Sequence, residues 1–529
     1  MTTSVGSRSH GATAPMTHRE VLEALSGLLL GMFVAMLSST VVSNALPRIV
    51  ADLGGSESGY TWVVVATLLT TTASTPIWGK LADLFSKKVL VQLGLVVFTI
   101  GSVLAGLAPS MGFLIGARAV QGVGVGAMTA LVQVVIATIV SPRERGRYSG
   151  YLGAVFALAT VSGPLIGGVI VDTSWLGWRW CFLVGIPFAA LAFVVLQKTL
   201  HLPVVRREVS IDYAGALLVT GGVSVLLVWV SLAGHQFAWG SALSFGLVAL
   251  GLVLLAAAVW VESRVGEPVI PLRLFRDRTT SLATGASAMV GLAMFGSTVF
   301  LSQYFQISRG MSPTEAGLMS LAMVGGLLLS SITSGRVIAA YGRWKGFLVG
   351  GASMTVVGLL LLGTIDDTTN LWLVGVFMAV LGIGIGATMQ NLVLAVQNNA
   401  AQSEIGAASS LVAFFRTMGG SIGVSVLGAI LGHRVSDSVT AGLHRLGVPP
   451  GGSGDSRSIP DMSTLPHPVR AVFEHAFGEA TGHIFWVAVP FAVAALVLSL
   501  LIREVPLRTT IERADELELP REPVTSHRG

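Results

Sequence analysis

Apolar runs alternate with short polar segments along almost the whole chain, and most runs are long enough to cross about 30 Å of hydrocarbon. We predict fourteen membrane-spanning helices, at 24–46, 60–80, 89–107, 113–140, 149–171, 180–200, 213–233, 241–261, 281–306, 314–338, 347–363, 371–395, 406–432 and 483–502. The pattern predicts an all-α integral membrane protein.

Lysine and arginine are distributed unevenly between the two sets of connecting segments. One set holds Lys87, Lys88, Arg143, Arg145, Arg147, Lys198, Arg206, Arg207, Arg264, Arg273, Arg276, Arg278, Arg336, Arg343, Lys345 and the tail from Arg503. Apart from 433–482, the other set holds only Arg48, Arg179 and Arg309. Because basic segments stay in the cytoplasm, we expect a multi-pass protein of the cell (inner) membrane with both termini cytoplasmic.

The segment 433–482 is the one extended outside loop in this topology. Its first half is rich in Gly, Pro and Ser and has no helical period. Its second half has apolar residues at helical spacing, from Val469 to Ala480, which predicts an amphipathic helix at the outer interface. That helix either leads into the last span or takes part in lipid or substrate access.

Composition narrows the class further. Hydrophobic residues make up 53% of the chain, charged residues only 11%, and the 64 glycines suit helices that pack closely in lipid. The net charge of +5 does not indicate nucleic acid, since the basic residues lie in short loops between apolar runs. The single cysteine, Cys181, excludes an internal disulfide and fits no zinc-binding spacing. Residues 1–18 lack the apolar core of a cleavable signal, so the first run is expected to remain as an anchor.

Two segments far apart in the chain resemble each other. The stretch 79–88 at the end of the second predicted span and the stretch 335–345 at the end of the tenth each begin with Gly and a base and end in further bases. Glycine triplets follow at similar distances, Gly122, Gly124 and Gly126 in the first case and Gly382, Gly384 and Gly386 in the second. We therefore predict two six-helix bundles (24–200 and 281–503), two helices inserted between them with a linker (201–280), and tails at 1–23 and 504–529. Duplicated membrane architectures of this kind carry substrate between the repeats and rock one against the other.

Four motifs in the first half point to a known family. They are residues 37–47, the run from Gly79 to Asp83 followed by Lys87 and Lys88, residues 114–118 followed by Gln121 and Gly122, and Gly153 followed by Gly163, Pro164, Gly167 and Gly168. Together with 268–272 and 416–420, they resemble the major facilitator superfamily, specifically its fourteen-span drug/proton antiporters. The chain departs from that pattern at Ser38, where an acidic residue is usual, and at Ser86, where glycine is usual.

The resemblance implies roles for several residues. Asp83, with Lys80, Lys87 and Lys88, would lock the cytoplasmic ends of helices in one state; the alternative is a solvated surface ion pair. Arg118, inside a span, would line the cavity or couple protons, unless it extends to the interface. Gly163, Pro164, Gly167 and Gly168 mark exporters in the family, although ordinary small-residue packing gives the same pattern.

The coupling proton has no obvious carrier, because no Asp or Glu lies deep within a predicted span. Glu315, Asp172 and His483, near span ends, are the possible protonation sites. Arg416, inside the thirteenth span, would either face an anionic group or bond helix carbonyls. For an adaptable substrate cavity of aromatic, Met and amide side chains we select Phe33, Met36, Ser38, Asn44, Gln133, Phe300, Gln303, Tyr304, Asn391 and Phe414.

We therefore expect a secondary transporter that exports amphipathic small molecules by proton antiport, with no cofactor, metal or obligate protein partner and the bilayer as its surroundings. Ser38 in place of an acid favours neutral, zwitterionic or lipid-like substrates over simple cations. The alternatives are an exporter of lipids or an endogenous metabolite, a channel and, most distantly, a membrane-embedded enzyme. An enzyme would need grouped His, Asp or Cys, but the ten histidines are scattered in loops and tails, and no GxxxxGK[ST] motif supports ATP-driven pumping.

Overall fold

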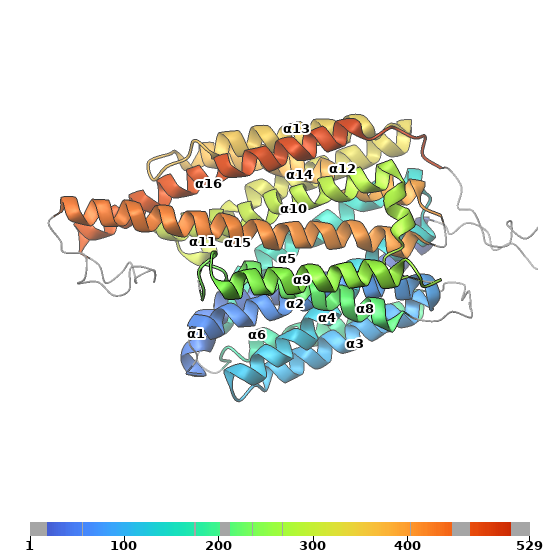
Figure 1. Cartoon of the computed structure of the whole chain (residues 1–529), viewed down its shortest axis with the longest axis horizontal. Coiled ribbons are helices and arrows are strands. Elements are labelled where there is room, and N and C mark those ends of the chain that lie inside the picture. Colours follow the sequence, from blue (N-terminus) through green and yellow to red (C-terminus); the bar gives the residue numbers. More distant parts are fainter. Residues whose placement is uncertain are drawn as a thin grey trace, which may run out of the picture.

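The computed structural model describes residues 18–54, 57–173, 176–200, 212–234, 236–266, 268–401, 404–446 and 466–508. Within these ranges the chain is helical apart from short connections, and long helices lie side by side in one elongated bundle (Figure 1). Twelve helices are long and apolar enough to cross a membrane among the described residues. With α2 and α5, which are 28 and 31 residues long, they correspond to the fourteen predicted spans.

Seven helices lie in the described residues of the N-terminal half. They are α1 (His18–Asp52), α2 (Glu57–Leu84), α3 (Lys87–Gly106), α4 (Met111–Ile139), α5 (Pro142–Asp172), α6 (Trp180–Leu183) and α7 (Gly185–Thr199). The short α6 and α7 together form the predicted sixth span, interrupted at Val184. Their apolar faces enclose two hydrophobic clusters that belong to this half alone.

The C-terminal half repeats the plan. It consists of η1 (Leu272–Arg276), α10 (Arg278–Gln303), η2 (Tyr304–Ser308), α11 (Pro313–Met319), α12 (Leu321–Tyr341), α13 (Lys345–Leu362), α14 (Leu371–Asn399), α15 (Ile405–Arg445) and α16 (His467–Leu501). One large hydrophobic cluster fills it. The predicted tenth span is the pair α11 and α12, which meet at Ser320.

The glycine triplets explain why the two halves look alike. In the N-terminal half, a Cβ at Gly122 or Gly126 would collide with α2, and one at Gly124 would collide with the backbone of Phe98 in α3. In the C-terminal half, Gly382 and Gly386 approach α12 in the same way, and Gly384 approaches α13. Because glycine has no Cβ, α4 and α14 can each pack closely against two neighbouring helices. Close packing of this kind stabilises helix association in membranes.

The threonines of α2 show how a polar helix is accommodated in this bundle. Thr71 donates its hydroxyl hydrogen to the carbonyl oxygen of Gly122 (3.0 Å), and Thr67 donates to that of Arg118 (3.3 Å). Both hydroxyls are satisfied inside the protein, as hydrocarbon requires. The bonds fasten α2 to α4.

The inserted helices α8 (Tyr213–Leu232) and α9 (Ala242–Glu262) pack against each other. Helix α8 contacts α2 of the N-terminal half and α15 of the C-terminal half. Val219 and Val223 of α8 form one apolar cluster with Phe414 of α15. The inserted pair therefore covers the place where α2 and α15 meet.

The predicted outside loop 433–482 is shorter than expected. Helix α15 continues to Arg445, and α16 already begins at His467, so the predicted amphipathic helix is the first part of the last helix and is continuous with its span. The two extensions project beyond the other helices as an antiparallel hairpin (Figure 1). Ala476 packs against Val439 and Leu443 of α15, and Phe477 and Ala480 pack into the large cluster of the C-terminal half. The place of this segment at the membrane interface stays a prediction.

A glycine substitution tests the close packing. We expect Gly122→Leu to lower the free energy of unfolding by about 1–3 kcal/mol, because the new side chain must push α4 away from α2. The same change at Gly116, on α4 but with nothing within 4 Å of its Cβ position, is the control. Thermal unfolding in detergent would show a lower Tm for the first variant alone, and equal Tm values would contradict this packing.

Candidate functional site

Asp83 joins the two halves at the end of α2. Its Oδ1 accepts a hydrogen bond from the N–H of Gly406 and its Oδ2 one from the N–H of Ala407, both at 2.8 Å. These N–H groups belong to the first turn of α15, where the helix has no internal acceptors for them. A carboxylate there also gains from the helix dipole.

Gly79, one turn earlier on α2, permits this contact. A Cβ at Gly79 would collide with Ser410 and lie 2.7 Å from the carbonyl oxygen of Gly406. Glycine therefore lets α2 and α15 touch along a full turn. We call the end of the bundle that contains Asp83 the tail end, and the opposite end the hairpin end.

The predicted basic partners of Asp83 are divided among different environments. Lys80 is buried and, with Asp212 and Val269, lines a small cavity next to the inserted helices. Lys87 and Lys88 are both half-buried, and Lys88 donates to the carbonyl oxygen of Gln197 in α7 (2.7 Å). The side chain of Lys88 is thus bonded within the N-terminal half.

A second contact between the halves lies close to the first and involves Arg145. From the first turn of α5, its guanidinium donates to the carbonyl oxygens of Val140 (2.9 Å) and Ala137 (2.6 Å) at the end of α4. Its Nη1 donates to Oε1 of Gln397 in α14 (3.0 Å), and Nε2 of Gln397 donates to Ser409 in α15 (2.8 Å). From the sequence, Arg145 was used only to assign topology; no motif marked Gln397 or Ser409.

Arg118 belongs to a polar network buried within the N-terminal half. Its Nη1 donates to Oε1 of Gln121 (2.5 Å), and its Nε lies 3.4 Å from the carbonyl oxygen of Val63. Nε2 of Gln121 donates to the hydroxyls of Ser38 in α1 (2.9 Å) and Ser102 in α3 (2.8 Å). The network therefore connects four helices, and Ser38 is part of it.

The glycines of α5 lie between the two halves. A Cβ at Gly163 would collide with Thr40 of α1, and one at Gly153 would lie 3.2 Å from Leu328 of α12. Gly167 is buried, and Pro164 and Gly168 lie in the same helix. The smooth surface of α5 thus faces α1 on one side and the C-terminal half on the other.

The predicted cavity residues do not form one group. Gln133 of α4 reaches Gln390 of α14 (Nε2 to Oε1, 3.4 Å), so it lies where the halves meet. Phe33 and Met36 are partly buried between the two clusters of the N-terminal half. Asn391 is buried and donates to the carbonyl oxygen of Ala387 in its own helix (2.6 Å).

The remaining cavity residues lie in other surroundings. The Tyr304 hydroxyl donates to the carbonyl oxygen of Asp366 (2.7 Å). Phe300 packs beside Gly428, and Gln303 is half-buried at the end of α10. Phe414 faces the inserted helices. The side chain of Asn44 lies outside the described residues.

The three predicted protonation sites lie near the hairpin end. Glu315 is exposed and forms a capping box with Ser312 at the start of α11. Nε2 of His483 lies 3.1 Å from a guanidinium nitrogen of Arg434. The side chain of Asp172 is outside the described residues.

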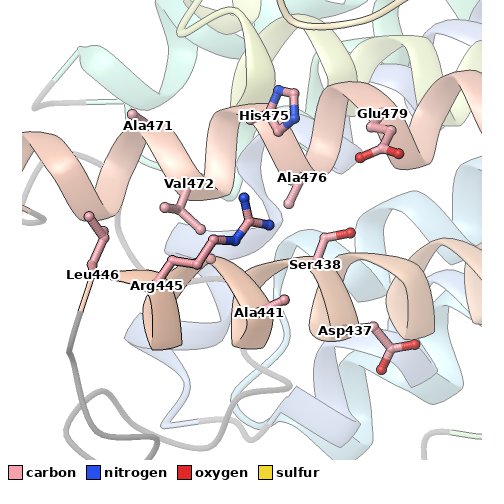
Figure 2. Close-up of a pocket in the computed structure, with 11 residues that line it drawn as sticks. Asp437, Ser438, Ala441, Arg445, Leu446, Ala471, Val472, His475, Ala476 and Glu479 are labelled. Carbon is pink, nitrogen blue, oxygen red and sulfur yellow. The ribbon is translucent and has the colours of Figure 1, made fainter.

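A groove of about 530 Å³ lies between the two arms of the projecting hairpin (Figure 2). Asp437 and Arg445 of α15 and His475 and Glu479 of α16 are among the residues that line it. Nδ1 of His475 contacts Asp367 in the connection between α13 and α14 (2.8 Å). This groove is at the hairpin end, away from Asp83 and Arg145. The described residues contain no group of three or more His, Cys, Asp or Glu able to hold a metal ion.

Two corresponding helix bundles define a membrane transporter of the duplicated type. We call the surface where they meet, which includes the contacts of Asp83, Arg145 and Gln133, the seam. The chain belongs to the major facilitator superfamily, because the model of that family matches residues 28–424.

Individual relatives agree with this assignment. An uncharacterised MFS-type transporter of Mycobacterium tuberculosis is 36% identical over 524 residues, covering 96% of this chain and 75% of the relative. The multidrug transporter MdtP of Bacillus subtilis is 35% identical over 416 residues, covering 79% and 76%. The proton:xylose symporter XylE shares the fold, with a TM-score of 0.62 at 14% identity over 92% of this chain and 97% of XylE.

The lock at Asp83 can be tested by labelling a thiol. Ser410→Cys places a thiol in the contact between α2 and α15, and the native Cys181 is buried. We expect Asp83→Asn to increase the rate of labelling about tenfold, since hydrogen bonds to charged groups contribute about 1.5–3 kcal/mol. Gln397→Ala should act in the same direction, because it removes the contact with Arg145 and leaves the bonds of Arg145 to α4 in place.

Asn399→Ala is the matched control, since Asn399 lies two residues beyond Gln397, and its contacts with Asp277 (3.4 Å) stay within the C-terminal half. Its labelling rate should equal that of the parent. Unchanged labelling in both Asp83→Asn and Gln397→Ala would show that these bonds do not hold the halves together.

Proposed function

We propose that this chain exports amphipathic small molecules across the cell membrane by proton antiport, opening alternately to the two sides. The observation that carries the proposal is the bond of Asp83 to the first turn of α15, a contact between halves that must part for the tail end to open. Relatives named as a multidrug transporter, a multidrug resistance protein and efflux pumps support export of such compounds.

The tail end is assigned to the cytoplasm, with both chain termini on that side. The basic residues predicted to be cytoplasmic, such as Lys87, Lys88 and Arg145, lie at this end. In this orientation the state described here is closed towards the cytoplasm. Substrate would then leave from the hairpin side.

The network of Arg118 is the proposed link to protons. A buried guanidinium is tolerated only with acceptors around it, and the chain supplies Gln121, itself held by Ser38 and Ser102. A change in the hydrogen bonds of this network would alter contacts among four helices together. The proton gradient is the proposed energy source, and no cofactor is invoked.

Export of lipids or a metabolite gains no separate support. The amphipathic helix that would have suited a lipid substrate packs against α15.

Transport in proteoliposomes tests the proposal. With an imposed pH gradient, the wild type should move amphiphiles against the direction of proton flow, and Arg118→Ala should reduce this flux at least about tenfold by removing the buried cation. Arg179→Ala, which removes an exposed arginine that stacks on Trp178, should export at the wild-type rate. Flux that ignores the pH gradient, or wild-type export by Arg118→Ala, would defeat the proposal.

A further inference from the structure

Arg416 is a buried cation in the middle of α15. Only 6% of the residue is exposed, and its Nη1 has no hydrogen-bond acceptor in the described part of the chain. A charged donor left in this condition is strongly unfavourable in a membrane protein.

The other two arginines that are buried in the described part of the chain have hydrogen-bond acceptors. Arg118 is 4% exposed and bonds Gln121, whereas Arg145 is 5% exposed and bonds two carbonyls and Gln397. The fold therefore provides acceptors for buried guanidinium groups elsewhere. Nη1 of Arg416 is the exception.

Helical spacing places Arg416 on the face of α15 that meets α14. It follows Ser409 by seven residues, so it lies on the same face of α15 about two turns deeper. Ser409 bonds Gln397, which in turn bonds Arg145 of the N-terminal half. The face that carries Arg416 thus meets α14 beside the residue that bonds the other half, and the backbone at Arg416 packs closely against Gly291 of α10.

Two amides lie at the same depth. Gln390 precedes Gln397 by seven residues on α14, so it too is about two turns deeper than the tail-end contact. It meets Gln133 of α4 across the seam at 3.4 Å, beyond the usual length of an amide hydrogen bond. These side chains can exchange this contact for a stronger acceptor at little cost.

A guanidinium and primary amides together suit an anion. Arginine presents a planar fork of donors that matches a carboxylate, sulfonate or phosphate oxygen pair, and amide NH₂ groups add neutral donors. Such a group would satisfy Nη1 of Arg416, and an apolar chain attached to it would lie among the helices. The level of Arg416 is near mid-membrane, since eleven residues separate it from the start of α15.

We propose that Arg416, assisted by Gln133 and Gln390, binds the anionic head group of an amphipathic substrate. This specifies the substrate class of the proposed function and rests on it. Arg416 supplies the charge, and the amides add specificity from both sides of the seam.

Binding to two matched probes tests the assignment. A dansyl-labelled alkyl sulfonate and the corresponding neutral sulfonamide differ only in head-group charge. With the full-length protein in nanodiscs, the wild type should bind the sulfonate more tightly, and Arg416→Gln should weaken that binding at least tenfold while leaving the sulfonamide within twofold. Arg416→Lys, which keeps the charge without the planar fork, should give an intermediate loss. Arg179→Gln removes an equal charge at an exposed site and should change neither affinity.

The outcomes separate this inference from the function on which it rests. Equal wild-type affinity for both probes, or equal loss of both in a folded Arg416→Gln protein, would overturn the head-group assignment. Thermal unfolding identifies a variant that fails to fold, and in that case the probe preference of the wild type and of Arg416→Lys decides the question. Gradient-driven export of neutral amphiphiles by the wild type would uphold the proposed transporter even then, whereas preferential sulfonate binding without any transport would defeat the transporter and keep the site.

Discussion

Every polar group inside a bilayer must find its partner within the protein, and this constraint shapes the whole chain. It explains why the threonines of α2 bond carbonyls of α4 and why Arg118 comes with Gln121. It also explains the form of the contact at the tail end, where free N–H groups of α15 meet a carboxylate from α2. Arg416 departs from this rule, because its buried Nη1 has no hydrogen-bond partner in the described part of the chain. An external acceptor is therefore expected there.

The tail-end contact consists of hydrogen bonds that water can replace. When the halves part, the N–H groups of Gly406 and Ala407 and the carboxylate of Asp83 would each become hydrated. Arg145 would keep its two bonds to α4 and exchange Gln397 for water. A buried ion pair broken into a dry interior would cost several kcal/mol, whereas bonds at the end of the bundle cost much less. Contacts of this kind hold one state and still allow the other.

Much of the fold could be predicted from the sequence, because length and hydropathy decide membrane spans directly. The glycine triplets also revealed the repeat, since each glycine marks a close helix approach whose partner is set by spacing. The hairpin was predicted less well. The loop 433–482 was predicted to be irregular in its first half and a separate amphipathic helix in its second, whereas α15 continues to Arg445 and the helix is the start of α16. The arms bury apolar residues against each other, which the pattern of single residues did not indicate.

The site was predictable only in part. Asp83 and Arg118 were identified through a motif and through a charge within a span, but no pattern indicated that Asp83 bonds backbone N–H groups on a helix more than 300 residues away. Gln397 and Ser409 are ordinary residues that matter only through their position, so no pattern could mark them. Tyr304 and Phe414 show a different difficulty, since an aromatic in a span packs against neighbouring helices as readily as it faces a ligand, and the sequence does not distinguish the two.

The inserted helices α8 and α9 cover the contact between α2 and α15 but add little resistance to the separation of the two halves. Trp229 of α8 donates to Ser244 of α9 (2.6 Å), which joins the two helices as one unit. That unit meets α15 through apolar side chains such as Val223 against Phe414. Lipid chains are as apolar as these surfaces, so exchanging one for the other changes the free energy little. The pair can therefore shield the contact between α2 and α15 without opposing its separation, and the directional bonds of Asp83 and Arg145 remain to decide when the tail end opens.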